Sequence, residues 1–342
     1  MSEAGLDGYV FIDGKELTVL GRPFDDTGRF YSRLPAAAEG VVPAPVWDLA
    51  QQATGISIDF ITDSRDIAVD YALEKDPKGG APDRSQVVDL YTHDGRRWSW
   101  VGILKPDPES WARRDIIRRD LKPVKRLYRA YLPHGHRVDF IRIGVPKGRL
   151  LEAAPPPAQK PICFYGTSII HGFHASRPGM TVPAQLSRRF HWPICNVAFS
   201  GNGRMDPELV EFFAELDPAV LTIDCLPNMS PQMVEERTIP FVEAMRQSHP
   251  EIPIVLVENV VYQHSYVQDD ARGGWGQKND VLKGQYAKLL ESGIENLHYL
   301  CGEGLLGNDG EATTDGVHPS DLGMWRLADA YASVLRPLLP FA

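Results

Sequence analysis

The sequence predicts an all-β sandwich followed by an α/β domain, in which a doubly wound, five-stranded parallel sheet lies between two layers of helices. Apolar residues alternate with polar or small ones over the first half, and a proline-rich segment ends that pattern. Beyond it, short apolar runs alternate with amphipathic stretches. A period of two indicates half-buried strands, and strands that alternate with helices indicate a parallel sheet.

The first half is read as strands separated by turns. The clearest alternation is Ile56, Ile58 and Phe60, and residues 67–73 repeat it. Further β-rich runs occupy residues 8–12, 86–93, 97–103 and 126–145. Such runs, bounded by turn-forming stretches, predict a sandwich over residues 1–153.

The boundary between the two halves is predicted at residues 154–161. This segment contains three consecutive prolines, which favour an extended, semi-rigid chain and continue neither a strand nor a helix. Residues 162–342 then form the second domain. Its strands are expected at residues 161–165, 194–198, 219–225, 253–259 and 296–301, and helices at 207–216, 278–293 and 321–335. Ser320 or Asp321 can cap the last helix.

Composition and charge restrict the class of protein. Hydrophobic residues make up 43% of the 342 and charged residues 24%, as in an ordinary folded protein. A net charge of -9 would repel a phosphate backbone, so we expect no nucleic-acid partner. The first residues lack the features of a signal peptide, and no apolar run approaches the roughly 18 residues of a membrane span. We therefore expect a cytoplasmic protein without a membrane partner, and leave its oligomeric state open.

The four cysteines indicate neither zinc binding nor thiol redox chemistry. They are widely separated, lie in apolar runs and form no Cys-x-x-Cys pair: Cys163, Cys195, Cys225 and Cys301. We expect buried free thiols.

Chemistry-bearing residues follow the expected strands at the edge where an open α/β sheet binds its ligands. Ser168 follows the first strand at the mouth of a helix, whose unpaired N–H groups and dipole can stabilise an oxyanion. The competing interpretation is that Ser168 only caps this helix. Gly201 follows the second strand and Asn228 the third, where a backbone N–H and a side-chain amide could donate to the same oxygen, although both are also common turn residues.

The last such segment is Thr314-Asp315-Gly316-Val317-His318, directly before the final helix. A nucleophilic serine needs a neutral imidazole to take its proton, and a carboxylate on the other ring nitrogen fixes the tautomer. An Asp-x-x-His loop brings both groups to one place. Alone, the segment could equally be a turn with a solvated histidine.

In this order and context the residues resemble the SGNH (GDSL-like) hydrolase family over about residues 160–338. The resemblance implies a flavodoxin-like domain in which Ser168, His318 and Asp315 form a catalytic triad. It also implies that Ser168 N–H, Gly201 N–H and the Asn228 amide hold the oxyanion, without a metal or an organic cofactor. The usual Gly-Asp-Ser reads Gly-Thr-Ser here, and Gly-x-Asn-Asp reads Leu-Pro-Asn-Met.

These departures resemble a branch that carries an N-terminal β domain. Asp89-Leu90-Tyr91 is similar to the Asp-Leu-Tyr signature of that domain, for which a jelly-roll-like sandwich is implied. The resemblance therefore extends over most of the chain.

Substrate contacts are expected from a smaller group of residues around this edge. His171 and His174 follow Ser168, Arg204 follows Gly201, and residues 262–276 form a long insertion after the fourth strand that could act as a lid. We name His171, Arg204, Tyr262 and Trp275 as candidates. The two histidines lack a third ligand, so we predict no metal site.

Two further tryptophans, Trp98 and Trp100, could stack on a sugar ring, although core packing suits residues on one strand face equally.

The leading functional prediction is hydrolysis of a small acyl ester, such as an acetyl group on a carbohydrate. The alternative is an acyltransferase that moves the acyl group to an alcohol acceptor such as a natural product. A third possibility is an inactive carbohydrate-binding protein. No Gly-x-Ser-x-Gly, P-loop or His-Glu-x-x-His motif occurs, which disfavours α/β-hydrolases, P-loop NTPases and zinc proteases.

Overall fold

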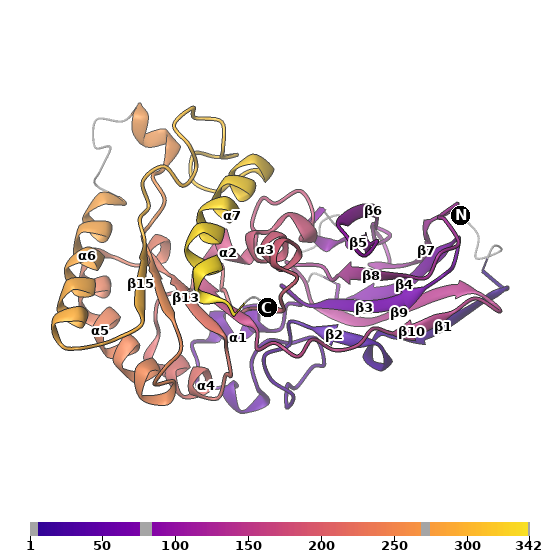
Figure 1. Ribbon diagram of the computed structural model, residues 1–342, viewed down its shortest axis with the longest axis horizontal. Coiled ribbons are helices and arrows are strands. Elements are labelled where there is room, and N and C mark those ends of the chain that lie inside the picture. Colours follow the sequence, from indigo (N-terminus) through magenta and orange to yellow (C-terminus); the bar gives the residue numbers. More distant parts are fainter. Residues whose placement is uncertain (1–5, 76–83, 268–273, 341–342) are drawn as a thin grey trace.

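Strands of the first half form two facing antiparallel sheets in the computed structural model, which describes residues 6–75, 84–267 and 274–340 (Figure 1). One sheet has the order β1 (Tyr9–Asp13), β9 (Val138–Pro146), β4 (Ile67–Leu73) and β7 (Ala112–Arg118). The other has the order β10 (Leu151–Ala153), β3 (Ser57–Thr62), β8 (Arg126–Tyr131), β5 (Val88–His93) and β6 (Trp98–Leu104), with β2 (Thr18–Leu20) also paired to β3. The alternating residues that predicted the strands, including Ile58, Phe60, Val69 and Tyr71, are buried between the sheets. The predicted antiparallel β domain is confirmed.

Three strands were not expected, and the run at residues 126–145 divides into β8 and β9. The unexpected strands are β2, β7 and β10. β7 reads Ala-Arg-Arg-Asp-Ile-Ile-Arg and lies at the end of its sheet, where its charged side chains reach solvent. Its sequence therefore lacks the clean alternation of a strand that is buried on one face.

The second half contains a five-stranded parallel sheet, as predicted. Its order is β12 (Ile194–Asn196), β11 (Ile162–Gly166), β13 (Val220–Asp224), β14 (Ile254–Val257) and β15 (Leu297–Leu300). β11 to β14 are buried throughout, which explains why they read as continuous apolar runs. The chain leaves β11 toward one edge and β13 toward the other, so the point at which ligands bind in such sheets lies between these two strands.

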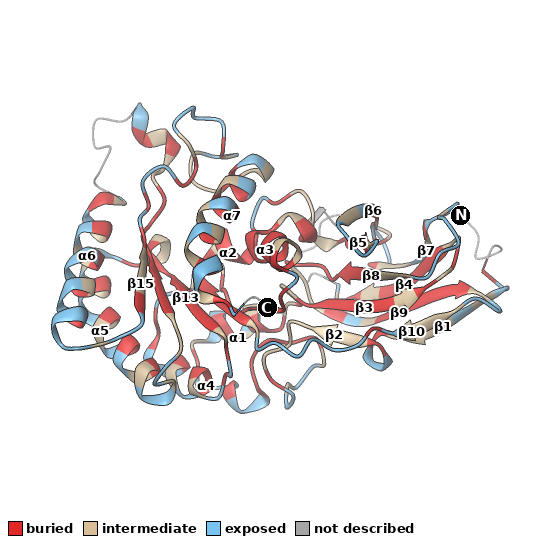
Figure 2. Ribbon diagram, in the orientation of Figure 1, coloured by how far each residue is buried: buried red, intermediate tan, exposed pale blue. Residues whose placement is uncertain are grey.

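Helices cover both faces of this sheet (Figures 1 and 2). One face packs against α1 (Ala44–Ala50), α4 (Val210–Ala214), α5 (Pro231–Ser248) and α6 (Gly276–Glu291). The other packs against α2 (Ser168–His171), α3 (Val182–Phe190) and α7 (Asp321–Leu335). This confirms the three-layer, doubly wound arrangement. Within the described ranges, no helix has both the length and the apolar character needed to cross a membrane.

The helix at residues 207–216 is shorter than expected, because it begins with a 3-10 turn, Pro207–Leu209, before α4. By contrast, α7 has the predicted bounds, and Ser320 caps it by accepting a hydrogen bond from the Gly323 N–H. α1, α3 and α5 were not among the helices expected. α5 contains Pro240, a residue that normally interrupts a helix.

A segment of the first half packs into the core of the second. Phe24 and Leu34, with Val46 and Ala50 of α1, belong to the same buried cluster as residues of β11 and β13. Arg33 lies among them with no exposed surface. Residues 154–161 join β10 to β11 without a helix or strand. The division at residue 153 remains a prediction, whereas the packing shows that the two halves share a core.

The cysteines are free thiols, and three of the four are buried. Cys301 differs from the expectation because it follows the last residue of β15 and is exposed.

Candidate active site

Ser168 lies at the carboxyl end of β11, next to the switch point of the sheet. Thr167 is the residue that precedes α2, and Ser168 is the first residue within the helix. Its side chain does not cap the helix, because Ser168 Oγ lies 2.9 Å from His318 Nε2. α2 has only four residues, so it supplies unpaired N–H groups but little of the dipole that the sequence argument invoked.

Asp315 and His318 come from one compact loop before α7. The Asp315 carboxylate accepts hydrogen bonds from the backbone N–H of His318 at 2.7 Å and of Val317 at 2.9 Å. Its other oxygen, Oδ2, lies 2.7 Å from His318 Nδ1. The three-residue spacing thus lets one carboxylate both close the turn and orient the ring. Gln263 supports the same loop, because its N–H donates to the Gly316 carbonyl at 2.8 Å.

The electrostatics keep Asp315 ionised. Its partial burial raises the pKa, but the hydrogen bonds from the His318 backbone and ring and from Val317 outweigh this effect and lower the pKa to about 2. An ionised carboxylate on Nδ1 keeps the imidazole proton on that nitrogen. Nε2 is then free to accept the Ser168 hydroxyl proton, which is the arrangement that nucleophilic catalysis by serine requires.

Gly201 and Asn228 lie in the loops that follow β12 and β13. Gly201 is exposed and has a φ of +72°, which a glycine adopts without strain. The Asn228 Oδ1 accepts a hydrogen bond from the Gly203 N–H at 3.3 Å, which connects the two loops and leaves the amide Nδ2 as the remaining donor group of this side chain. Within the described part of the chain, neither Ser168 N–H nor Gly201 N–H donates to another group. These three donors follow neighbouring strands of one sheet.

His171, a predicted substrate contact, is buried between the halves and lines the cavity beside the site. Its Nε2 lies 2.8 Å from both Thr54 Oγ1 and the His134 carbonyl oxygen. Burial lowers its pKa well below the usual value, and the nearby Arg33 charge lowers it further. The ring is therefore a neutral hydrogen-bonding group that joins the β domain to α2.

Two rings just beyond α2 contact His318, and the sequence predicted neither contact. The Phe173 and His174 ring centroids lie 4.8 and 5.4 Å from that of His318. His174 Nδ1 also forms a hydrogen bond with Thr314 Oγ1. Phe173 is about half exposed. The available signal in the sequence was the ring-rich run His-Gly-Phe-His at residues 171–174, shortly after Ser168.

A cavity of about 700 Å³ opens beside this site, and both halves of the chain line it. Leu49, Gln86 and His134 come from the first half, and Phe173, His174 and Ser200 from the second. The cavity borders the site through the two rings on His318 and through Ser200, which precedes Gly201. Among its described lining residues none is Asp, Glu, Lys or Arg.

The remaining candidates do not line this cavity. Arg204 is exposed and donates to the Gly201 carbonyl at 2.8 Å. Tyr262 donates to Asn259 Oδ1 at 3.1 Å, and Trp275 Nε1 donates to Ser265 Oγ at 3.0 Å. Contact of these residues with substrate stays a prediction. Residues 268–273 of the expected lid lie outside the described residues.

Trp98 and Trp100 differ in their surroundings. Trp98 is partly buried and packs under Arg129, whose Cζ lies 4.9 Å from the ring, whereas Trp100 is about half exposed.

In the described ranges, no three His, Cys, Asp or Glu side chains are grouped so as to hold a metal ion.

Comparison with protein families identifies the chain. Residues 159–336 match the model of the GDSL-like lipase/acylhydrolase family, which is more than half of the sequence. The chain belongs to the GDSL-like lipase/acylhydrolase family. Residues 9–151 match a second model, described as the N-terminus of SGNH-hydrolase-type esterases. Both parts of the predicted resemblance are thereby confirmed. A search of curated proteins gave no match.

Solved structures share the whole two-part architecture of this GDSL-like protein. A putative GDSL-like lipase from Bacteroides ovatus ATCC 8483 is 28% identical, with a TM-score of 0.90 over 96% of this chain and 98% of that one. The salicylyl-acyltransferase SsfX3 from a tetracycline biosynthetic pathway is 20% identical, with a TM-score of 0.76 over 97% and 98%. A family two carbohydrate esterase from Cellvibrio japonicus is 12% identical, with a TM-score of 0.62 over 96% and 98%. The latter two show a common fold.

Proposed function

We propose that this GDSL-like protein is a serine esterase that removes a small acyl group from a neutral, hydroxyl-bearing compound such as a carbohydrate. The observation that carries the proposal is the continuous hydrogen-bonded path from Ser168 Oγ through the His318 ring to the Asp315 carboxylate. Family membership supports acyl chemistry. Among the described residues that line the cavity none is Asp, Glu, Lys or Arg, which favours an uncharged partner for the ester.

In the proposed reaction, Ser168 Oγ attacks the acyl carbon while its proton moves to His318 Nε2. Ser168 N–H, Gly201 N–H and Asn228 Nδ2 would stabilise the oxyanion, and each such donor is typically worth roughly 10²- to 10³-fold in rate. The imidazolium then gives its proton to the departing alcohol, which leaves the acyl group on Ser168. A water molecule, deprotonated by His318, attacks this ester and releases the acid and the free serine.

Acyl transfer is the second candidate, and the size of the cavity favours it. An acceptor alcohol bound among residues such as Gln86, His134 and Ser200 could replace water in the second step. The fold that the chain shares with a salicylyl-acyltransferase supports this alternative. Either reaction concerns a small-molecule substrate, and the cytoplasmic location expected from the sequence suits both.

The test is Ser168→Ala, with the exposed serine of α7, Ser333→Ala, as the matched control. Wild type and Ser333→Ala should hydrolyse p-nitrophenyl acetate and acetylated sugars, whereas Ser168→Ala should lose at least roughly 10³-fold in kcat with an unchanged circular dichroism spectrum. Retained activity in Ser168→Ala would exclude the assignment. Acyl products on added alcohols, at the expense of free acid, would favour the transferase.

A further inference from the structure

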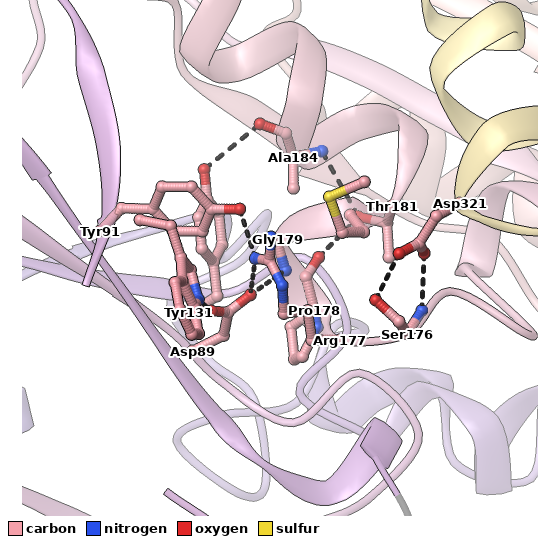
Figure 3. Close-up of polar contacts among 12 residues, drawn as sticks. Asp89, Tyr91, Tyr131, Ser176, Arg177, Pro178, Gly179, Thr181, Ala184 and Asp321 are labelled. Atoms are coloured by element: carbon pink, nitrogen blue, oxygen red, sulfur yellow. Dashed lines mark hydrogen bonds and ion pairs between the residues drawn. The ribbon is translucent and has the colours of Figure 1, made fainter. Parts of the chain in front are cut away.

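Asp89, in the Asp-Leu-Tyr motif of β5, lies at the contact between the two halves of the molecule. Its side chain has no exposed surface. Asp89 Oδ2 accepts hydrogen bonds from Arg177 Nη1 at 2.8 Å and from the Gly179 N–H at 2.9 Å. Its Oδ1 accepts a third, from Trp100 Nε1 at 3.0 Å. A carboxylate from the β domain therefore holds the chain that follows α2 (Figure 3).

The packing around this carboxylate is close on every side. Arg177 Nη1 also forms a hydrogen bond with the Tyr91 hydroxyl, and the Arg177 Cζ lies 5.3 Å from the ring centroids of Tyr91 and of Trp100. At Gly179, a Cβ atom would lie 2.4 Å from the Tyr91 ring and 2.7 Å from Asp89 Oδ2. The motif thus fits one backbone path and excludes a side chain at Gly179.

The chain held in this way, residues 173–179, is also fixed to the first residue of α7 through Ser176 in its middle. Ser176 N–H and Ser176 Oγ donate to the two oxygens of Asp321, at 2.8 and 2.5 Å (Figure 3). Asp321 begins α7, three residues after His318. Phe173 and His174, whose rings contact His318, precede these fixed residues by two to six positions. A path of direct contacts therefore runs from the β domain to the catalytic histidine.

We infer that Asp89 is a positioning residue, which holds Arg177 and Gly179 and so keeps residues 173–179 packed against His318. The kinetic consequence rests on the proposed function, because it assumes that His318 relays the proton of Ser168. Small displacements of a reacting group cost up to about 10²-fold in rate, so loss of this support should lower turnover and not only stability.

Asp89→Asn tests the inference, because it keeps the size of the side chain but removes half of its acceptor capacity. In one orientation of the amide, its oxygen faces Arg177 and Gly179 and its NH₂ group faces the Trp100 N–H. In the other orientation, the NH₂ group faces the donors of both Arg177 and Gly179. Either way a buried donor meets another donor. We expect kcat for p-nitrophenyl acetate to fall by about 10- to 100-fold, with a shifted pH midpoint of kcat/KM.

Asp59→Asn is the matched control. Asp59 is also buried, and it binds Arg129 through two hydrogen bonds of 2.7 Å. Arg129 in turn donates to Ser187 Oγ of α3 at 2.8 Å, so this pair also joins the two halves. Among the described residues, neither Asp59 nor Arg129 forms a side-chain hydrogen bond or ring contact with residues 173–179. Asp59→Asn should therefore lower the melting temperature while kcat and the pH midpoint stay at the wild-type values.

Hydrogen–deuterium exchange decides the inference without reference to activity. Amides in residues 173–180 should exchange at least about tenfold faster in Asp89→Asn, and at the wild-type rate in Asp59→Asn. Unchanged exchange there, or equal kinetic effects in the two variants, would overturn the positioning role. If wild type and Ser168→Ala are equally inert toward esters, the proposed function fails, and the exchange result still decides whether Asp89 holds the segment.

Discussion

Asp224 is the last residue of β13, next to the switch point, and its carboxyl group takes no part in the proposed reaction. It is buried, and its Oδ2 accepts a hydrogen bond from the Tyr331 hydroxyl of α7 at 2.7 Å. Burial raises the pKa of Asp224 to about 7, while the Tyr331 hydrogen bond offsets part of this effect. The folded protein therefore holds a proton on Asp224 at pH values where the unfolded chain has released it.

This proton predicts how stability depends on pH. Because the folded pKa lies above the unfolded one, stability is lost as pH rises from about 4 to about 7, at roughly 1.4 kcal/mol per pKa unit. Asp224→Asn has no charge to bury at pH 8. Its free energy of unfolding at this pH should therefore exceed that of wild type, by on the order of 4 kcal/mol at most. Urea unfolding at pH 4.5 and pH 8 measures the free energy of unfolding of the variant and of wild type. A difference between the two proteins that is equal at both pH values would contradict the prediction.

Residues that carry chemistry could be identified from the sequence because each follows a strand, and strand ends meet at one edge of a parallel sheet. The structure brings Ser168, Asp315 and His318 into hydrogen-bonding contact, as that argument expects. Phe173, His174 and Asp89 could not be assigned in the same way. Their contacts with His318 and with residues 177–179 depend on how the two halves pack together. The local periodicity of the sequence does not predict this packing.

At the scale of elements, the segment around α1 shows how the first half supports the loops of the second. The Arg33 side chain donates to four carbonyl oxygens, of Leu49, Gln52, Asn196 and Ala198, at 2.6 to 3.1 Å. Asn196 is the last residue of β12, and Ala198 lies in the loop between β12 and Gly201. Burial lowers the pKa of Arg33 to about 9, because the charged guanidinium loses its contact with water.

Arg33→Met should destabilise the protein by about 3 kcal/mol or more, since each buried carbonyl left unpaired costs about 1–3 kcal/mol. Urea unfolding at pH 7 provides the measurement, with the exposed Arg96→Met as the control. A loss of less than about 1 kcal/mol would show that water replaces the guanidinium at these carbonyls.

The elements themselves differ in how far the sequence predicts them. β4 and α7 have the predicted bounds, because alternation and a serine cap are local signals. β7 is charged along its length, and α5 contains Pro240 within its helix. Packing onto the neighbouring sheet stabilises these two elements against their local preference, which only the tertiary structure reveals.

At the scale of the whole molecule, the shared core predicts that the second half will not fold alone. A fragment of residues 154–342 lacks Arg33, Phe24 and α1, and so exposes the buried side chains of β11 and β13 that they cover. We expect this fragment to aggregate or to unfold without a cooperative transition. Circular dichroism melting of the purified fragment tests this, with the full chain as the control, and a sharp melt close to that of the full chain would contradict it.

The burial of residues 24–50 also has a consequence for the order of events during synthesis. These residues are synthesised before the strands that cover them, because β11 to β14 follow more than a hundred residues later in the chain. The apolar side chains of Leu34, Val46 and Ala50 therefore remain unburied until the strands of the second half have been translated. The two halves therefore cannot complete their folding one after the other from the amino end. The long-range contacts between them favour slow folding with chaperone assistance.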